Sequence, residues 1–147
     1  MRTGLIRVKS RSSLDKYKQI ILLQVVKPVI QIKRNARELQ PAEIPEPLDL
    51  VVADVSFISV TKILPPAVLI AKPGATFLIL IKPQFELRRE DIGEGGIVKD
   101  PSLHKKAIAS VKNAAKSSGL EILGVSPSCI TGVEGNQEFF LHARKIV

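Results

Sequence analysis

Two ionisable residues each end a strongly apolar stretch of this chain. Asp54 follows the stretch 50–53, and Lys82 follows the stretch 77–81. Charged side chains are rarely placed at the end of a Val/Ile/Leu run unless something there uses them. In an open α/β sheet, the carboxyl ends of neighbouring strands face the crevice where ligands bind. A carboxylate and an ammonium at such ends predict a site, although a salt bridge between strand ends would give the same pattern.

The segments around these two residues alternate between strand and helix patterns. Strands are predicted at 29–32, 48–55, 76–81, 120–125 and 138–143. The unbroken apolar run at 48–55 is typical of a sheet covered on both faces. Ser59 can cap a helix that extends to about Ala71, is restarted or kinked at Pro65 and Pro66, and is ended by Gly74.

The clearest helix pattern covers residues 101–118. Asp100 is its predicted N-cap, Pro101 occupies the first position, and Gly119 ends it. The order of elements predicts an α/β fold: a partial Rossmann-like sheet, mostly parallel, with an antiparallel C-terminal hairpin and flanking helices. This domain covers 29–147, and 1–28 is a basic N-terminal segment of uncertain structure. Within it, 11–27 fits either a weak amphipathic helix or a disordered arm.

The positive charge of the chain is concentrated in its first quarter. Residues 1–38 hold ten Lys and Arg against two acidic residues, and the remainder holds twelve of each sign, so this segment carries the whole net charge of +8. A basic segment favours polyanions, with nucleic acid first. A solvated basic tail explains the composition equally well.

Other residues narrow the class of protein. The single cysteine, Cys129, excludes a disulfide framework and favours a reducing cytoplasm, and it has no catalytic partner in the sequence. His104 and His142 lack metal-ligand spacing, so no metal site is predicted and a structural or solvent-exposed role is preferred for both. The longest apolar stretch, 63–81, is broken by proline and glycine, which excludes a membrane span.

Five motifs, in this order, resemble one known family. They are Asn-Ala-Arg at 35–37, Asp-Val-Ser-Phe-Ile-Ser at 54–59, Lys-Pro-Gln-Phe-Glu at 82–86, Gly-Gly-Ile-Val-Lys-Asp-Pro at 95–101 and Ile-Thr-Gly-Val-Glu-Gly-Asn-Gln-Glu-Phe at 130–139. With them, residues 35–147 resemble the C-terminal two-thirds of the methyltransferase domain of hemolysin A-like (TlyA) proteins, which are FtsJ-type ribose 2′-O-methyltransferases.

The resemblance implies a reaction and a set of residues. It implies methyl transfer from S-adenosylmethionine to a ribose 2′-hydroxyl of ribosomal RNA by a Lys-Asp-Lys-Glu tetrad, of which Asp54, Lys82 and Glu138 are present. It also places Asn35 near the adenine of the cofactor and Asp54 near its methyl end. The loop 88–96 next to this site is either a mobile substrate loop or a solvated one.

The departures from the family are equally specific. The glycine-rich cofactor turn and the first lysine of the tetrad are missing, and Ile32-Lys33-Arg34 stands where the family tends to carry an acidic residue that holds the cofactor ribose. Basic and apolar side chains cannot accept hydrogen bonds from ribose hydroxyls. We therefore expect a truncated member that is inactive and does not bind S-adenosylmethionine by itself.

One alternative function and one mode of association stay open. The chain could be a non-catalytic RNA-binding or assembly remnant, in which the basic segment holds RNA. The exposed edge of a cut sheet also favours self-association.

Overall fold

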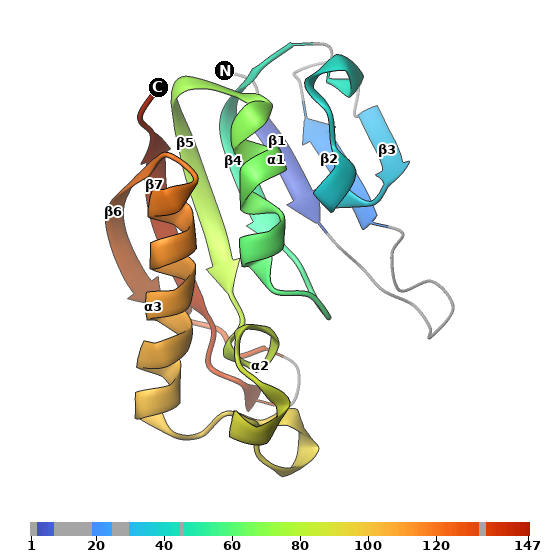
Figure 1. The fold of residues 1–147 in the computed structure, drawn as a ribbon. Coiled ribbons are helices and arrows are strands. Elements are labelled where there is room, and N and C mark those ends of the chain that lie inside the picture. Colours follow the sequence, from blue (N-terminus) through green and yellow to red (C-terminus); the bar gives the residue numbers. More distant parts are fainter. Residues whose placement is uncertain (1–2, 8–18, 25–29, 45, 133–134) are drawn as a thin grey trace.

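The sheet contains seven strands and carries its helices on one face (Figure 1). The structure, a computed structural model, describes residues 3–7, 19–24, 30–44, 46–132 and 135–147. The strands are β1 (Thr3–Arg7), β2 (Gln19–Gln24), β3 (Ile30–Arg34), β4 (Leu48–Asp54), β5 (Ala71–Ile81), β6 (Leu120–Pro127) and β7 (Phe139–Lys145). The helices are α1 (Leu64–Leu69), α2 (Pro83–Glu86) and α3 (Pro101–Ser117).

Five short 3-10 turns complete the described elements. They are η1 (Ala36–Glu38), η2 (Pro41–Glu43), η3 (Val60–Lys62), η4 (Arg89–Asp91) and η5 (Glu94–Gly96). In the described part of the chain, no helix is long and apolar enough to cross a membrane.

The strand order is β3-β2-β1-β4-β5-β7-β6. Strand β4 pairs in parallel with β1 and β5, while β7 is antiparallel to both β5 and β6. The α/β class and the antiparallel C-terminal hairpin are therefore confirmed. The parallel character is confined to β1, β4 and β5, because β2 pairs antiparallel with both β1 and β3.

The prediction of a helix or a disordered arm over 11–27 is wrong at residues 19–24, which form β2; the rest of that range lies outside the described residues. A run of Ile20, Ile21, Leu22 and Leu23 is a good strand former once strands lie on both sides of it. Its basic flanks obscured that signal in the sequence. The sheet consequently begins before residue 29.

The segment after β4 is a 3-10 turn followed by a short helix, as the two prolines predicted. Ser59 caps η3, since its side chain accepts a hydrogen bond from the Thr61 amide, and α1 then starts afresh at Leu64. Gly74 does not end this helix, because α1 ends at Leu69 and Gly74 lies inside β5 with φ +77. It marks the irregular register between β4 and β5, where a left-handed residue is needed.

The predicted helix at 101–118 is confirmed in detail. Helix α3 starts at Pro101, and the Asp100 side chain accepts a hydrogen bond of 2.7 Å from the Ser102 amide. Its buried side chains, Ala107, Val111 and Ala115, lie on the side that faces the sheet. Small residues on that side let the helix approach β5 and β6 closely.

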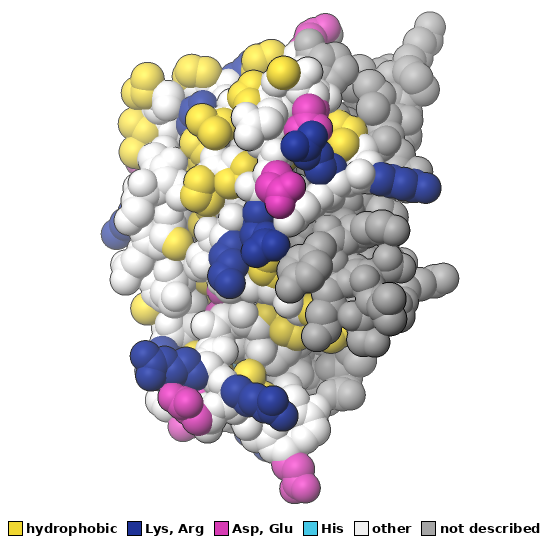
Figure 2. Space-filling view, turned by 45° about the vertical axis from the view of Figure 1, so that its right-hand side comes forward, with side chains coloured by type: hydrophobic (Ala, Val, Ile, Leu, Met, Phe, Trp, Pro, Cys, Tyr) yellow, Lys and Arg dark blue, Asp and Glu magenta, His cyan; other side chains and the backbone are white. Residues whose placement is uncertain are grey.

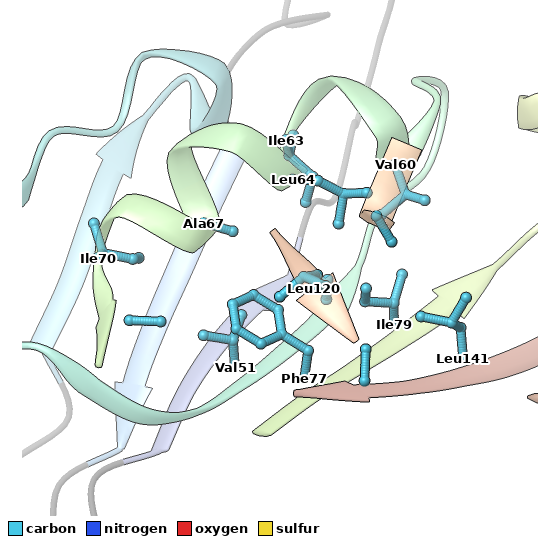
Figure 3. Packing of buried hydrophobic residues seen from close by; sticks show 14 of the residues in the cluster. Val51, Val60, Ile63, Leu64, Ala67, Ile70, Phe77, Ile79, Leu120 and Leu141 are labelled. Atoms are coloured by element: carbon cyan, nitrogen blue, oxygen red, sulfur yellow. The ribbon is translucent and has the colours of Figure 1, made fainter. Parts of the chain in front are cut away.

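The hydrophobic core lies between the sheet and the helices. In Figure 3, Val51 and Phe77 of the two central strands lie below Ile63, Leu64 and Ala67 from the η3–α1 segment, and all five are buried. Burying an aliphatic or aromatic side chain of this size contributes about 1.5–3 kcal/mol. This packing fixes η3 and α1 against the face of the sheet formed by β4 and β5.

Glu86 ties together the two turns that follow β4 and β5. Its carboxylate accepts hydrogen bonds from the Ser59 hydroxyl at 2.5 Å and from the Val60 amide at 2.7 Å. Burial raises the pKa of Glu86, and the two hydrogen bonds lower it by less. The residue therefore spans 26 positions of sequence to hold the start of η3 against α2.

We expect Glu86→Gln to gain stability relative to the wild type as the pH rises from 5 to 8. Because burial raises the folded-state pKa of Glu86, the stability it contributes is complete below its ordinary pKa and is lost as the pH rises through the folded value. Glutamine stays uncharged and can still accept from the Val60 amide. Urea unfolding at both pH values measures the difference in unfolding free energy.

Glu86→Ala is the control for this comparison. It leaves the Val60 amide without its acceptor, which costs about 1–3 kcal/mol at either pH. An unfolding free energy that changes with pH equally in the wild type and in Glu86→Gln would contradict the prediction.

Candidate active site

The parallel pairing of β4 and β5 brings Asp54 and Lys82 together. Both strands end at the same edge of the sheet, and Asp54 Oδ1 lies 2.7 Å from Lys82 Nζ, an ion pair whose geometry is not that of a hydrogen bond. The Lys82 side chain is only 14% exposed and that of Asp54 is 32% exposed. The two charged groups predicted at the strand ends therefore lie together, with limited access for solvent.

Glu138 joins them from the neighbouring strand. It immediately precedes β7, whose Phe139 pairs with Ile81 of β5, so the register sets residue 138 beside residue 82. Glu138 Oε1 lies 3.9 Å from Lys82 Nζ, and the side chain is 10% exposed. Lys82 also donates a hydrogen bond of 3.2 Å to Ser56 Oγ. Three of the predicted site residues thus form one cluster.

The electrostatics of the cluster favour a proton on Glu138. Burial raises the pKa of Glu138 above its ordinary value; the Lys82 ammonium opposes this shift and the Asp54 carboxylate reinforces it. Burial makes a carboxylate harder to ionise than it is in water. The arrangement can hold a proton close to Lys82.

A pocket of about 340 Å³ opens beside this cluster. It is lined by Ser56, Phe57, Lys82, Gln84, Phe85, Ile92, Gly96, Asn136 and Glu138. Residues from the turns after β4 and β5, from the loop 88–96 and from the segment before β7 all contribute to its walls. Four of the five motifs that resemble the known family therefore meet around one cavity.

Two aromatic residues of this pocket had not been singled out from the sequence. Phe57 has the left-handed φ of 64° and is 71% exposed, and its ring centroid lies 5.2 Å from that of Phe85. A positive φ at a bulky residue is strained and is usually kept for a reason. The sequence signal for Phe57 is an aromatic residue in the short segment between Asp54, at the end of the strand, and Ser59, which caps the next turn.

Asn136 holds the far wall of the pocket. Its side chain is buried, accepts a hydrogen bond of 2.9 Å from the Val98 amide and donates one of 3.1 Å to the Gly96 carbonyl. His104 contacts the Val98 carbonyl through Nε2 at 2.8 Å and packs its ring edge against Phe139. These contacts fit the structural alternative of the two roles predicted for His104. No group of described residues could hold a metal ion.

The loop 88–96 is neither detached nor wholly solvated. It forms η4 and η5, and Asp91 Oδ2 pairs with Lys106 Nζ of α3 at 2.6 Å. Ile92 and Gly96 of this loop line the pocket. The loop is thus part of the cavity wall.

Asn35 lies outside the cluster. Its side chain caps η1: Oδ1 accepts from the Arg37 amide at 3.2 Å, and Nδ2 donates to Glu38 Oε1 at 3.0 Å. It is not one of the residues that line the pocket beside Lys82. Its predicted contact with the cofactor adenine stays a prediction.

The residues before Asn35 do not fit S-adenosylmethionine well. The end of β3 presents Lys33 and Arg34, whose side chains are donors only and cannot accept a hydrogen bond from a ribose hydroxyl. The Arg34 guanidinium is also paired with Glu43 at 2.6 Å. The sequence also holds no glycine between Gly4 and Gly74, and hence no glycine-rich turn after β1. Among the described residues, the cluster therefore offers a lysine held between two carboxylates beside a pocket, and positions 33 and 34 offer no acceptor for a ribose hydroxyl.

Comparison with known proteins agrees with the motifs and with the fold. The FtsJ-like methyltransferase family matches residues 10–145, which begins further toward the N-terminus than the motifs do. The 16S/23S rRNA (cytidine-2′-O)-methyltransferase TlyA of Mycobacterium tuberculosis is 41% identical over 116 residues, which are 79% of this chain and 43% of the relative. This chain therefore spans less than half the length of that curated relative.

Solved structures give the same picture. A Streptococcus thermophilus protein described as a hemolysin is 38% identical, with a TM-score of 0.74 over 76% of this chain and 41% of that chain. A SAM-dependent methyltransferase from Methanosarcina mazei, 16% identical, has a TM-score of 0.50 over 78% of this chain and 66% of that chain, a likeness of fold alone. With the family match covering nearly the whole sequence, this chain belongs to the FtsJ-like methyltransferase family and has its Rossmann-like fold.

Proposed function

We propose that Asp54, Lys82 and Glu138 form the substrate side of a catalytic site for 2′-O-methylation of a ribose in ribosomal RNA. The observation that carries this proposal is a nearly buried lysine ammonium, held between two carboxylates at the wall of a pocket. The relative named as an rRNA (cytidine-2′-O)-methyltransferase supports the choice of substrate. In this family the methyl group comes from S-adenosylmethionine.

The chemistry requires such a group because a ribose hydroxyl is a weak nucleophile until its proton is held or removed. Lys82 can accept that proton in its neutral form, or polarise the hydroxyl oxygen as an ammonium. Asp54, 2.7 Å away, orients the lysine head. Glu138, whose pKa burial raises, can exchange a proton with the lysine or hold the ribose. The transfer itself needs no metal ion.

The aromatic wall of the pocket supports a nucleotide substrate. Phe57 is exposed and lies beside Phe85, so a base could stack on this pair while its ribose faces Lys82. Stacking of a base on an aromatic side chain contributes about 1–3 kcal/mol. Figure 2 shows Lys and Arg interspersed with Asp and Glu on one face of the molecule. Because residues 39–147 hold twelve residues of each sign, we assign the contact with RNA phosphates mainly to the basic segment 1–38.

We expect the isolated chain to show neither saturable S-adenosylmethionine binding at micromolar concentration nor methyl transfer. The ribose-facing end of β3 is basic, and the glycine-rich turn is missing from the sequence, so several hydrogen bonds of about 1 kcal/mol each are lost. Isothermal titration calorimetry and incorporation of tritiated methyl groups into ribosomal RNA measure the two properties. Micromolar binding by the pure 147-residue protein would contradict the expectation.

A chimera separates the contribution of the cofactor side from that of the proposed catalytic cluster. Joining the N-terminal part of the Mycobacterium tuberculosis relative to residues 35–147 should restore binding and methyl transfer. In that chimera, Lys82→Met should lower the rate by about 10²–10⁴-fold. Lys72→Met is the matched control, because it removes an ion pair of 2.8 Å with Asp49 between the same two strands, away from the pocket. Equal rates in the two variants would exclude the role of Lys82.

A second candidate function is RNA binding without catalysis, which the localised charge of +8 favours. Deleting residues 1–28 should then weaken binding to ribosomal RNA fragments in a gel-shift assay, and the affinity of the full chain should fall steeply as salt rises through counterion release. Unchanged binding after the deletion would exclude a role for this segment.

We also propose that the chain associates with itself through an edge of its sheet. Strand β6 is the last strand on one side, and its Leu123 is exposed, so its backbone and an apolar side chain are available to a second copy. Sedimentation equilibrium over a range of concentrations should show a dimer that Leu123→Lys weakens. A wild-type chain that stays monomeric at high micromolar concentration would exclude this association.

A further inference from the structure

Gly132 lies against the carboxylate of Glu138. A Cβ added at Gly132 would overlap Glu138 Oε1, and it would lie 2.8 Å from Cδ and 3.3 Å from Cγ. Carbon atoms in favourable contact are about 3.5–4.0 Å apart. The φ angle of Gly132 is not in the left-handed region. The glycine is therefore needed for space, and not for its backbone conformation.

The backbone on both sides of this contact is held in place. The Gly132 amide donates to the Asn136 carbonyl at 2.8 Å, and Asn136 is itself fixed to the Gly96–Val98 segment by its side chain. The carbonyl of Glu138 accepts from the Ser128 amide at 2.8 Å. Because neither backbone can easily retreat, an added methyl group would move the Glu138 carboxylate.

The oxygen that would be displaced is the one that faces Lys82. Glu138 Oε1, in contact with Gly132, is also the atom 3.9 Å from Lys82 Nζ. Glu138 also lines the pocket of about 340 Å³, so open space is available beside its side chain. A side chain at residue 132 would therefore change the distance between the lysine and the acid.

We propose that Gly132 is a positioning residue: its missing side chain leaves the space in which the Glu138 carboxylate lies buried beside Lys82. The effect of Gly132 on catalysis rests on the role proposed above for Glu138. The contact between the two residues is a matter of distance and does not depend on that role. The charged groups that act on Glu138 are Lys82, from the end of β5, and Asp54, from the end of β4.

A titration of Glu138 tests the proposal without any methyl transfer. In Gly132→Ala the carboxylate should move toward the pocket and become better solvated. Because burial is the largest cause of its raised pKa, its titration midpoint should fall toward the ordinary value for glutamate. Carboxyl ¹³C NMR of glutamate-labelled protein measures the midpoint, with the signal assigned by Glu138→Gln.

Gly124→Ala is the matched control. The φ angle of Gly124 is also outside the left-handed region, and a Cβ there meets nothing within 4 Å. The titration midpoint of Glu138 in Gly124→Ala should therefore equal that of the wild type. A Glu138 midpoint in Gly132→Ala that matches those of the wild type and of Gly124→Ala would overturn the proposal. The titration of Glu138 does not depend on whether the chimera transfers methyl groups, so each of the two proposals can be contradicted without the other.

A double variant covers the case in which Gly132→Ala folds poorly. In Gly132→Ala/Glu138→Asp the carboxylate is one methylene shorter and should fit beside the new methyl group. The double variant should therefore recover thermal stability relative to Gly132→Ala, although Glu138→Asp alone gains none, a non-additivity expected of residues in direct contact. Additive effects of the two substitutions on the melting temperature would overturn the proposal.

Discussion

The structure around the pocket depends on one requirement, the compensation of the Lys82 ammonium. A nearly buried ammonium is costly unless carboxylates and hydrogen-bond acceptors surround it. Strand β4 supplies Asp54, the turn after it supplies Ser56, and the residue before β7 supplies Glu138. Because Lys82, Asp54 and Glu138 come from the ends of three separate strands, the charge can be compensated only when β4, β5 and β7 are in the correct register.

The same requirement explains the rigidity of the surrounding turns. Glu86 holds the turn after β4 against the turn after β5, and Asn136 holds the segment 96–98 against the start of β7. Each clamp joins residues more than 25 positions apart, so each restrains the ends of strands that lie side by side only in the fold. The side chains around Lys82 are thus positioned by hydrogen bonds between distant segments and not by loop sequence alone.

The sequence predicts the parts of this arrangement that depend on local patterns. The apolar runs of β4 and β5, the cap of α3 at Asp100, and the meeting of Asp54 with Lys82 follow from periodicity and from strand ends. Glu138 was predicted only from the resemblance of the motif 130–139 to a known family, because a carboxylate before an apolar strand does not by itself indicate a site. The left-handed Phe57 and the contact of Gly132 with Glu138 depend on distant segments, which leave no periodic signal.

The strand order separates this fold into two chemical halves. Cofactors in doubly wound sheets bind at the point where the strand order reverses, between β1 and β4, through the turn after the first strand. The cluster of Asp54, Lys82 and Glu138, for which we propose a role toward the nucleophile, lies instead at the ends of β4, β5 and β7. Because the β1–β4 pairing joins the two halves within the sheet, changes beyond it can alter cofactor recognition while β4, β5 and β7 keep their charges in register. An intact lysine–carboxylate cluster therefore shows that the ends of β4, β5 and β7 are in register, and it gives no information on the affinity for a cofactor.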